Sequence, residues 1–200
     1  MSKVFATVVM LILAGSAQAQ TLRSIEDYEK RGAQRYTQSD YDGAISDFTM
    51  VIEMVSGLGS KEDLRGNDWS PPNGPNNLTS KRVTVIDPRA AVAYSNRGIA
   101  KMAKGDSAGA ISDFDVALSI NPGQALVYYN RGTVWLSVGD SERAFADYDK
   151  SVRLDSRLAI SYVGRATARL NKGDRAGALI DYEQAIKLAP RNAQIYYNRG

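Results

Sequence analysis

The stretch Tyr94-Ser95-Asn96-Arg97-Gly98 returns three times, at a constant spacing of about 34 residues. The later copies are Tyr128-Tyr129-Asn130-Arg131-Gly132, Tyr162-Val163-Gly164-Arg165-Ala166 and Tyr196-Tyr197-Asn198-Arg199-Gly200. A fixed period of this length is typical of arrays built from one repeated supersecondary unit. Such a unit cannot bury its own apolar face, so neighbouring units stack to form a continuous core. The sequence therefore predicts a repeat array, and binding rather than catalysis is the first expectation for its function.

The second half of each period repeats a series of small and aromatic residues. A small residue stands twelve positions after the Gly or Ala of the motif, an aromatic follows four positions later, and another small residue three positions after that. The three series are Ala110, Phe114 and Ala117; Ala144, Tyr148 and Ser151; and Ala178, Tyr182 and Ala185. Spacings of three and four place such residues on one face of a helix.

A glycine followed by an aspartate divides each period into two halves. These pairs are Gly105-Asp106, Gly139-Asp140 and Gly173-Asp174. Glycine readily closes a helix, and aspartate favours the start of the next one. We therefore predict helices near 91–104 and 107–120, with counterparts at the same places in the next two periods, and no strand within 89–192.

At these positions the chain resembles the tetratricopeptide repeat family, whose 34-residue unit is a helix-turn-helix. The resemblance implies an all-α superhelical array, a right-handed α-solenoid. An earlier copy of the pattern contains Tyr28, Arg31, Gly32, Ala44, Asp47 and Phe48. It precedes its counterparts by nearly two periods, so an insertion almost as long as one repeat separates the two copies. The predicted organisation is a signal peptide at 1–19, repeats at 25–56, 91–124, 125–158 and 159–192, an irregular insertion at 57–90, and the start of a fifth repeat at 193–200. The insertion is expected to be either a loose loop or a flap that contacts a partner.

An arginine precedes the small residue of every motif, where members of this family generally carry an apolar residue. The first four of these arginines are each followed, at sixteen positions further on, by an aspartate. The predicted pairs are Arg31 with Asp47, Arg97 with Asp113, Arg131 with Asp147, and Arg165 with Asp181. The planar fork of arginine suits a two-point contact with a carboxylate, so we expect ion pairs that fix the two helices of each repeat. The alternative, an arginine row that binds an anionic ligand, is disfavoured because the aspartates neutralise it. The small residues, Gly98 and Gly132 among them, are expected where two helix backbones approach closely.

Composition excludes several classes of function. Twenty-five basic residues against 22 acidic ones give a net charge of +3, without the basic excess typical of a nucleic-acid binder. The chain has no Cys and no His, which removes thiol nucleophiles, imidazole bases and the common zinc sites. No glycine-rich phosphate loop ending in Gly-Lys-Ser or Gly-Lys-Thr occurs. We expect no catalytic residue, no metal site, no cofactor and no enzymatic activity.

The beginning of the chain, 1–19, has the pattern of a secretory signal peptide. Lys3 supplies a basic start, 4–14 form an apolar run, and Ala17-Gln18-Ala19 provides a small-x-small cleavage site. The apolar run has about 11 residues, whereas a membrane-spanning helix needs roughly 20. We expect an exported bacterial protein, periplasmic most simply or extracellular, without stable membrane insertion after cleavage.

The resemblance also implies a place for a partner. In family members that capture peptides, the first helices of successive repeats line a concave groove, and asparagines at the positions of Asn96 and Asn130 hydrogen-bond the peptide backbone. Tyr129 and Val163 would add apolar surface, whereas Gly164 interrupts the asparagine row. The alternative is that these asparagines serve only the repeat itself. A clamp for a C-terminal carboxylate is not expected, because the lysine that it needs is replaced at Ser95, Tyr129, Val163 and Tyr197.

The predicted function is thus an exported scaffold that binds a protein or peptide through the concave face of the array. One alternative is a targeting or regulatory segment of a longer exported enzyme whose catalytic part lies beyond Gly200. Another is a purely structural array without a dedicated ligand.

Overall fold

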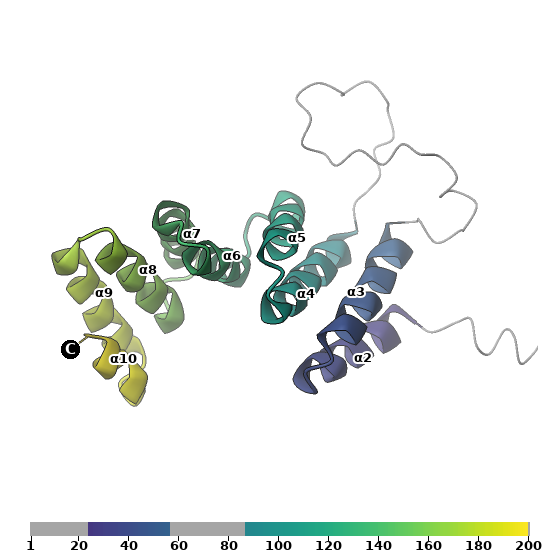
Figure 1. Ribbon diagram of the computed structural model, residues 1–200, viewed down its shortest axis with the longest axis horizontal. Helices are drawn as coiled ribbons and strands as arrows, with labels where there is room; N and C mark the ends of the chain where they lie inside the picture. The colour runs from purple at the N-terminus through teal and green to yellow at the C-terminus, as the bar shows by residue number, and fades with distance from the viewer. Residues whose placement is uncertain (1–23, 57–86, 200) are drawn as a thin grey trace, which may run out of the picture.

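The computed structural model describes residues 24–56 and 87–199. These residues form only helices and loops: α2 (Ile25–Thr37), α3 (Tyr41–Val55), α4 (Pro88–Lys104), α5 (Ser107–Ile120), α6 (Ala125–Ser137), α7 (Ser141–Leu154), α8 (Ala159–Asn171), α9 (Arg175–Leu188) and α10 (Ala193–Arg199). Figure 1 shows the helices following one another in pairs, from α2 and α3 at one end of the molecule to α8 and α9 at the other, where the single helix α10 follows. The predicted all-α solenoid is confirmed. The predicted signal peptide at 1–19 and residues 57–86 of the predicted insertion lie outside the described part of the chain.

The turn between the two helices of a repeat is built by the glycine and aspartate that the sequence singles out. Gly105 has a φ of 90°, and Gly139 and Gly173 have nearly the same left-handed conformation. The carboxylate of Asp106 then accepts a hydrogen bond from the Gly109 amide at 2.9 Å and caps α5. In the first repeat Ser39 takes the place of the glycine and adopts a φ of 62°. The turn geometry is therefore retained where the glycine is missing.

The first helix of the second repeat begins earlier than predicted. The predicted insertion includes 88–90, but α4 starts at Pro88, and Ala90 is buried. Asp87 accepts a hydrogen bond from the Arg89 amide at 2.9 Å and so caps the helix. Proline is favourable in the first helical position because its missing amide hydrogen needs no partner there. An aspartate followed by proline was the sequence signal for this boundary.

The glycines of the first three motifs, Gly32, Gly98 and Gly132, face an aromatic ring on the second helix of their repeat, and Gly132 also faces its backbone. A Cβ atom at Gly98 would lie 2.8 Å from Cε1 of Phe114, a fully buried side chain of the second helix. At Gly132 the ring of Tyr148 would lie at 3.1 Å and the backbone oxygen of Ala144 at 3.3 Å. In each of these repeats, an aromatic ring of the second helix therefore packs against a small residue of the first helix.

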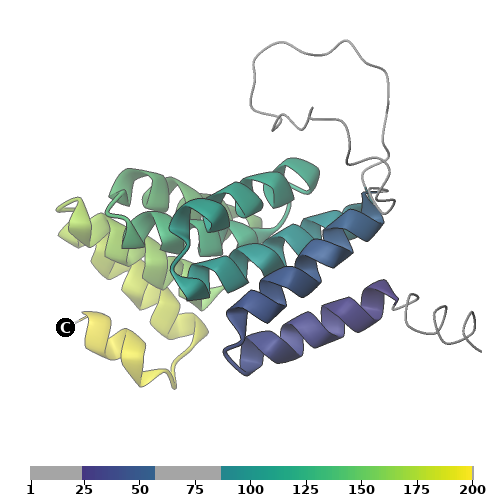
Figure 2. The same cartoon turned by 45° about the vertical axis from the view of Figure 1, so that its right-hand side comes forward.

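Neighbouring repeats share apolar clusters, and Figure 2 shows the helix pairs stacked against one another. One cluster joins Phe114 and Leu118 of α5 to Val127 and Val134 of α6. Polar groups at these joints are satisfied: the Ser151 hydroxyl donates to the Ala125 carbonyl oxygen and lies 2.7 Å from the buried Ser161 hydroxyl. Across 24–56 and 87–199, no helix is both long and apolar enough to cross a membrane.

Candidate functional site

The arginine row forms two-point contacts with the predicted aspartates. Arg97 donates from Nε and Nη2 to the two carboxylate oxygens of Asp113, at 2.9 and 2.7 Å. The same contact joins Arg31 to Asp47, Arg131 to Asp147, and Arg165 to Asp181. All four aspartates are buried. Each pair links the first helix of a repeat to the second.

A second cation meets the buried aspartate in three of the repeats. It stands one helical turn after the arginine, as Arg35, Lys101 and Arg169, at 3.1, 2.9 and 2.9 Å from the carboxylate. In the third repeat this position is Trp135, which packs against the Ala144 and Tyr148 cluster. The guanidinium of Arg143 lies over the Trp135 ring, 4.5 Å from its centroid. Trp135 is therefore part of the packing, and Asp147 has Arg131 as its cation.

The arginines also connect each repeat to the one before. Arg131 Nη1 donates to Asp115 at 2.5 Å, and Arg165 Nη1 donates to Asp149 at 2.8 Å. Burial lowers the pKa of Arg131, but its hydrogen bonds and Coulomb attraction to Asp147 and Asp115 outweigh that effect and leave the pKa raised. Arg31, Arg97, Arg131 and Arg165 are thus each held by a buried carboxylate, so these four arginines offer no free site for an anion. Sequence reasoning missed Asp115 and Asp149, although both stand sixteen positions before an arginine of the next motif.

The residues next to the arginines line a groove of about 790 Å³ between the first helices of successive repeats. We call it the α4–α6–α8 groove. Its walls are Ser95, Asn96 and Ile99 of α4; Gly123, Gln124, Ala125, Leu126, Val127, Tyr129 and Asn130 in and before α6; and Leu154, Asp155, Leu158 and Ile160 around the start of α8. Three of the four predicted partner-binding residues, Asn96, Asn130 and Tyr129, therefore meet in one hollow.

The fourth predicted residue, Val163, is not among the residues that line this groove. It packs instead against the core cluster that contains Tyr162, Tyr182 and Ile195. Gly164 interrupts the asparagine row for a steric reason, since a Cβ atom there would lie only 2.5 Å from Cε1 of Tyr148. The Tyr148 ring of the third repeat thus occupies the space that an asparagine side chain of the fourth would need.

The groove combines apolar and polar lining residues. Leu126 and Ile160 are 53% and 43% exposed and present apolar surface to a ligand. They stand one repeat period apart, four positions before Asn130 and Gly164, and this phase was the sequence signal that could have found them. Within 24–56 and 87–199, the side chains of Asn96 and Asn130 take part in no hydrogen bond, so both amides are available to a ligand.

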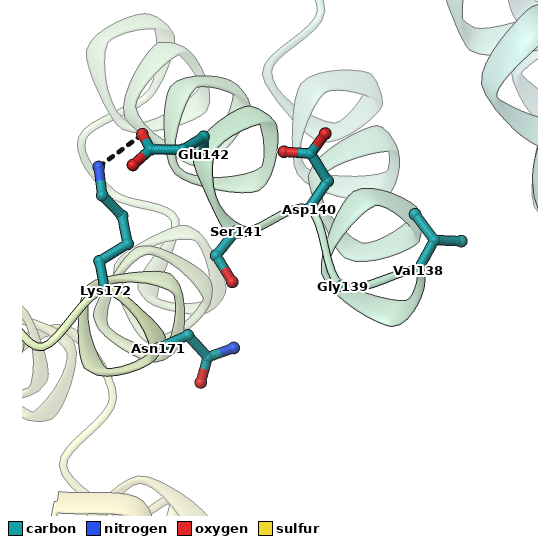
Figure 3. A pocket seen from close by; sticks show the side chains of 7 residues that line it. All are labelled: Val138, Gly139, Asp140, Ser141, Glu142, Asn171 and Lys172. Atoms are coloured by element: carbon teal, nitrogen blue, oxygen red, sulfur yellow. Dashed lines mark hydrogen bonds and ion pairs between the residues drawn. The ribbon is translucent and has the colours of Figure 1, made fainter.

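A second hollow, of about 630 Å³, lies at the turn between α6 and α7. Figure 3 shows its side chains, with Lys172 after α8 reaching Glu142 on α7 at a distance of 2.7 Å. Lys104 and Asp42 make the corresponding contact between the first two repeats. These charges satisfy each other, so the hollow is an ion-paired joint between repeats.

The polar side chains of the α4–α6–α8 groove can form hydrogen bonds to a ligand. They are the amides of Asn96, Gln124 and Asn130, the hydroxyls of Ser95 and Tyr129, and the carboxylate of Asp155. No group of three or more His, Cys, Asp or Glu side chains that could hold a metal ion occurs in the described part of the chain. Amides beside aliphatic and aromatic side chains can hydrogen-bond a backbone and accommodate the side chains that alternate along it.

Comparison with known proteins identifies the family that has this architecture. The chain matches the Tetratricopeptide repeat family over residues 86–159 and 163–200, more than half of its length. A comparison with curated proteins finds no match.

Several solved structures share the fold. The first TPR of Spaghetti (RPAP3) bound to the HSP90 peptide SRMEEVD has a TM-score of 0.55 and 21% identity, over 56% of this chain and 90% of that one. The Arabidopsis OM64 TPR domain has a TM-score of 0.54 and 23% identity, over 56% and 92%. The second TPR domain of human RPAP3, in complex with the HSP70 peptide SGPTIEEVD, has a TM-score of 0.55 and 25% identity, over 56% and 95%. The repeat motif, its helix pairs and these matches show that the chain belongs to the tetratricopeptide repeat family.

Proposed function

We propose that this protein is an interaction scaffold that binds an extended peptide segment of a partner protein in the α4–α6–α8 groove. The observation that carries the proposal is the meeting of Asn96 and Asn130 in one groove, each with an amide that makes no hydrogen bond within the described residues. Two of the similar structures hold a peptide, and their peptides are SRMEEVD and SGPTIEEVD. Binding by amides to a backbone, with side chains in apolar subsites, is a common mode of peptide recognition.

The double substitution of Asn96 and Asn130 by alanine tests this function. Each lost hydrogen bond is expected to cost about 0.5–1.5 kcal/mol, so partner affinity should fall by roughly one to two powers of ten. The amides line an open groove rather than the core, and the melting temperature should therefore stay unchanged. Calorimetric titration of the partner peptide, with a parallel thermal scan, measures both quantities.

Asn171→Ala serves as the matched control, because Asn171 is exposed at the end of α8 and lines the ion-paired joint instead of the groove. It should leave affinity and stability unchanged. Lost stability with unchanged affinity in the double variant would mean that the two asparagines serve the repeat, and peptide binding in this groove would be refuted.

We further propose that the protein acts after export, in the periplasm or outside the cell. The support is the basic start, apolar run and Ala17-Gln18-Ala19 cleavage site at the beginning of the chain. N-terminal sequencing of protein from the cell envelope fraction should find Gln20 as the first residue. A chain that still begins at Met1 and resides in the cytoplasm would refute export, without affecting the proposal for the groove.

A further inference from the structure

The α4–α6–α8 groove has one charged side chain in its lining, and this charge indicates which peptides it can bind. Asp155 is the one charged side chain among the residues that line it; the others are aliphatic, aromatic, amide, hydroxyl or glycine. Arg97 and Arg131, which follow the lining residues Asn96 and Asn130, bind the carboxylates of Asp113, Asp147 and Asp115. Arg153 and Arg157 flank Asp155 and are exposed, but neither lines the groove, and Arg153 pairs with Asp149. The groove therefore presents a carboxylate and no compensating cation among its lining residues.

Asp155 is held in place by the backbone. Its Oδ1 accepts a hydrogen bond from the Arg157 amide at 2.9 Å, in the loop between α7 and α8. Within the described residues, the other carboxylate oxygen makes no hydrogen bond and no ion pair. On one side of Asp155 stands the exposed Leu154, and Leu158 and Ile160 follow within the same groove wall. A cationic ligand group that reached Asp155 would thus also bring its apolar stem against aliphatic side chains, as lysine and arginine commonly do.

We propose that the groove selects internal peptide segments that are apolar and carry a lysine or arginine directed to Asp155, and that it rejects acidic segments and free C-termini. This inference rests on the proposed function. A ligand carboxylate in this groove would lose water without meeting a cation among the lining residues, which is unfavourable, and it would be repelled by Asp155. An internal segment avoids both costs, because its backbone is uncharged and the amides of Asn96 and Asn130 can bond to it.

The test is selection of peptides by the full chain from two displayed libraries of short random segments, one flanked on both sides and one with free C-termini. Peptides from either library should be enriched in Leu, Ile, Val or Phe with one Lys or Arg, and depleted in Asp and Glu by about fivefold or more. The free C-terminus should give no advantage. Selection should be lost in the Asn96→Ala, Asn130→Ala double variant.

An enriched lysine-containing peptide is then used to test whether its lysine binds Asp155. Asp155→Asn keeps the bond from the Arg157 amide but removes the charge, and it should weaken binding of this peptide about two- to fivefold, as expected for a partly exposed ion pair. Replacing the peptide's lysine by glutamine should lower the affinity for the natural protein by the same factor. It should cause no further loss of affinity for the Asp155→Asn variant. Glu183→Gln on α9, an exposed residue outside the groove, is the control and should change neither affinity.

The outcomes separate the two proposals. Enrichment of acidic peptides or of free C-termini, lost in the asparagine double variant, would overturn the charge selection and leave peptide binding standing. An Asp155→Asn variant that binds the lysine peptide as well as the natural protein would likewise overturn it. If neither library gave enriched peptides, peptide binding in this groove and the charge selection would both be overturned. The same holds if the Asn96→Ala, Asn130→Ala double variant enriched the same peptides as the natural protein.

Discussion

Replacement of Asp113 by alanine should lower the free energy of unfolding by about 3–5 kcal/mol, because it leaves two cations without their buried partner. Arg97 and Lys101 both contact this carboxylate, at 2.7 and 2.9 Å, and their side chains are only 17% and 19% exposed. Within the described residues nothing acidic replaces the lost partner, since the remaining hydrogen bond of the Arg97 side chain goes to the hydroxyl of Thr49. Urea denaturation followed by circular dichroism measures the change.

Two other aspartates provide matched comparisons. Asp147→Ala should cost less than Asp113→Ala, because Arg131 keeps its ion pair with Asp115. Asp115→Ala should cost only about 0–1 kcal/mol, since Asp115 is 46% exposed and water replaces the lost contact. If all three variants lost the same small amount, the buried carboxylates would not be the element that fixes the helix pairs.

The helices and the pairs within each repeat were predictable from the sequence because every repeat carries the same residues in the same phase. For example, the left-handed conformation of Gly105 and the helix cap formed by Asp106 recur at the equivalent glycines and aspartates of the later repeats. The two-point contact of Arg97 with Asp113 follows from the same regularity, since the offset of sixteen positions between arginine and aspartate is the same in all four repeats. The start of α4 at Pro88 was missed because no other repeat has an aspartate and a proline at this position.

The groove was predictable only in part, because its details depend on how one repeat leans on the next. Val163 has the phase of Tyr129 but packs into the core cluster of the last repeats with Ile195. Gly164 could not be explained from spacing, since the explanation is the direction in which the Tyr148 ring points. Asp155 lies in a loop outside the repeated motif, so its place in the groove emerges only when α6, α7 and α8 are assembled.

The contact between Gly98 and Phe114 gives the second large prediction. Phe114 is fully buried between its own repeat and the next, in a cluster with Val127 and Val134 of α6. Phe114→Ala should therefore destabilise the protein by about 3–5 kcal/mol through lost burial and the cavity that remains. Gly98→Leu should cost about 1–3 kcal/mol for the opposite reason, since its Cβ atom alone would lie 2.8 Å from the ring.

The double variant decides whether these two costs share one physical origin. A leucine at position 98 points into the space that the Phe114 ring vacates, so the Gly98→Leu, Phe114→Ala protein should be more stable than the sum of the single changes allows, by about 0.5–3 kcal/mol. Ala103→Leu, on the exposed side of α4, is the control and should show no such coupling to Phe114→Ala. Denaturant unfolding of the four proteins in each cycle gives the coupling energy. Strict additivity for Gly98 and Phe114 would mean that the ring does not rest on the glycine, and the small residue of every motif would then need another explanation than the aromatic side chain opposite it.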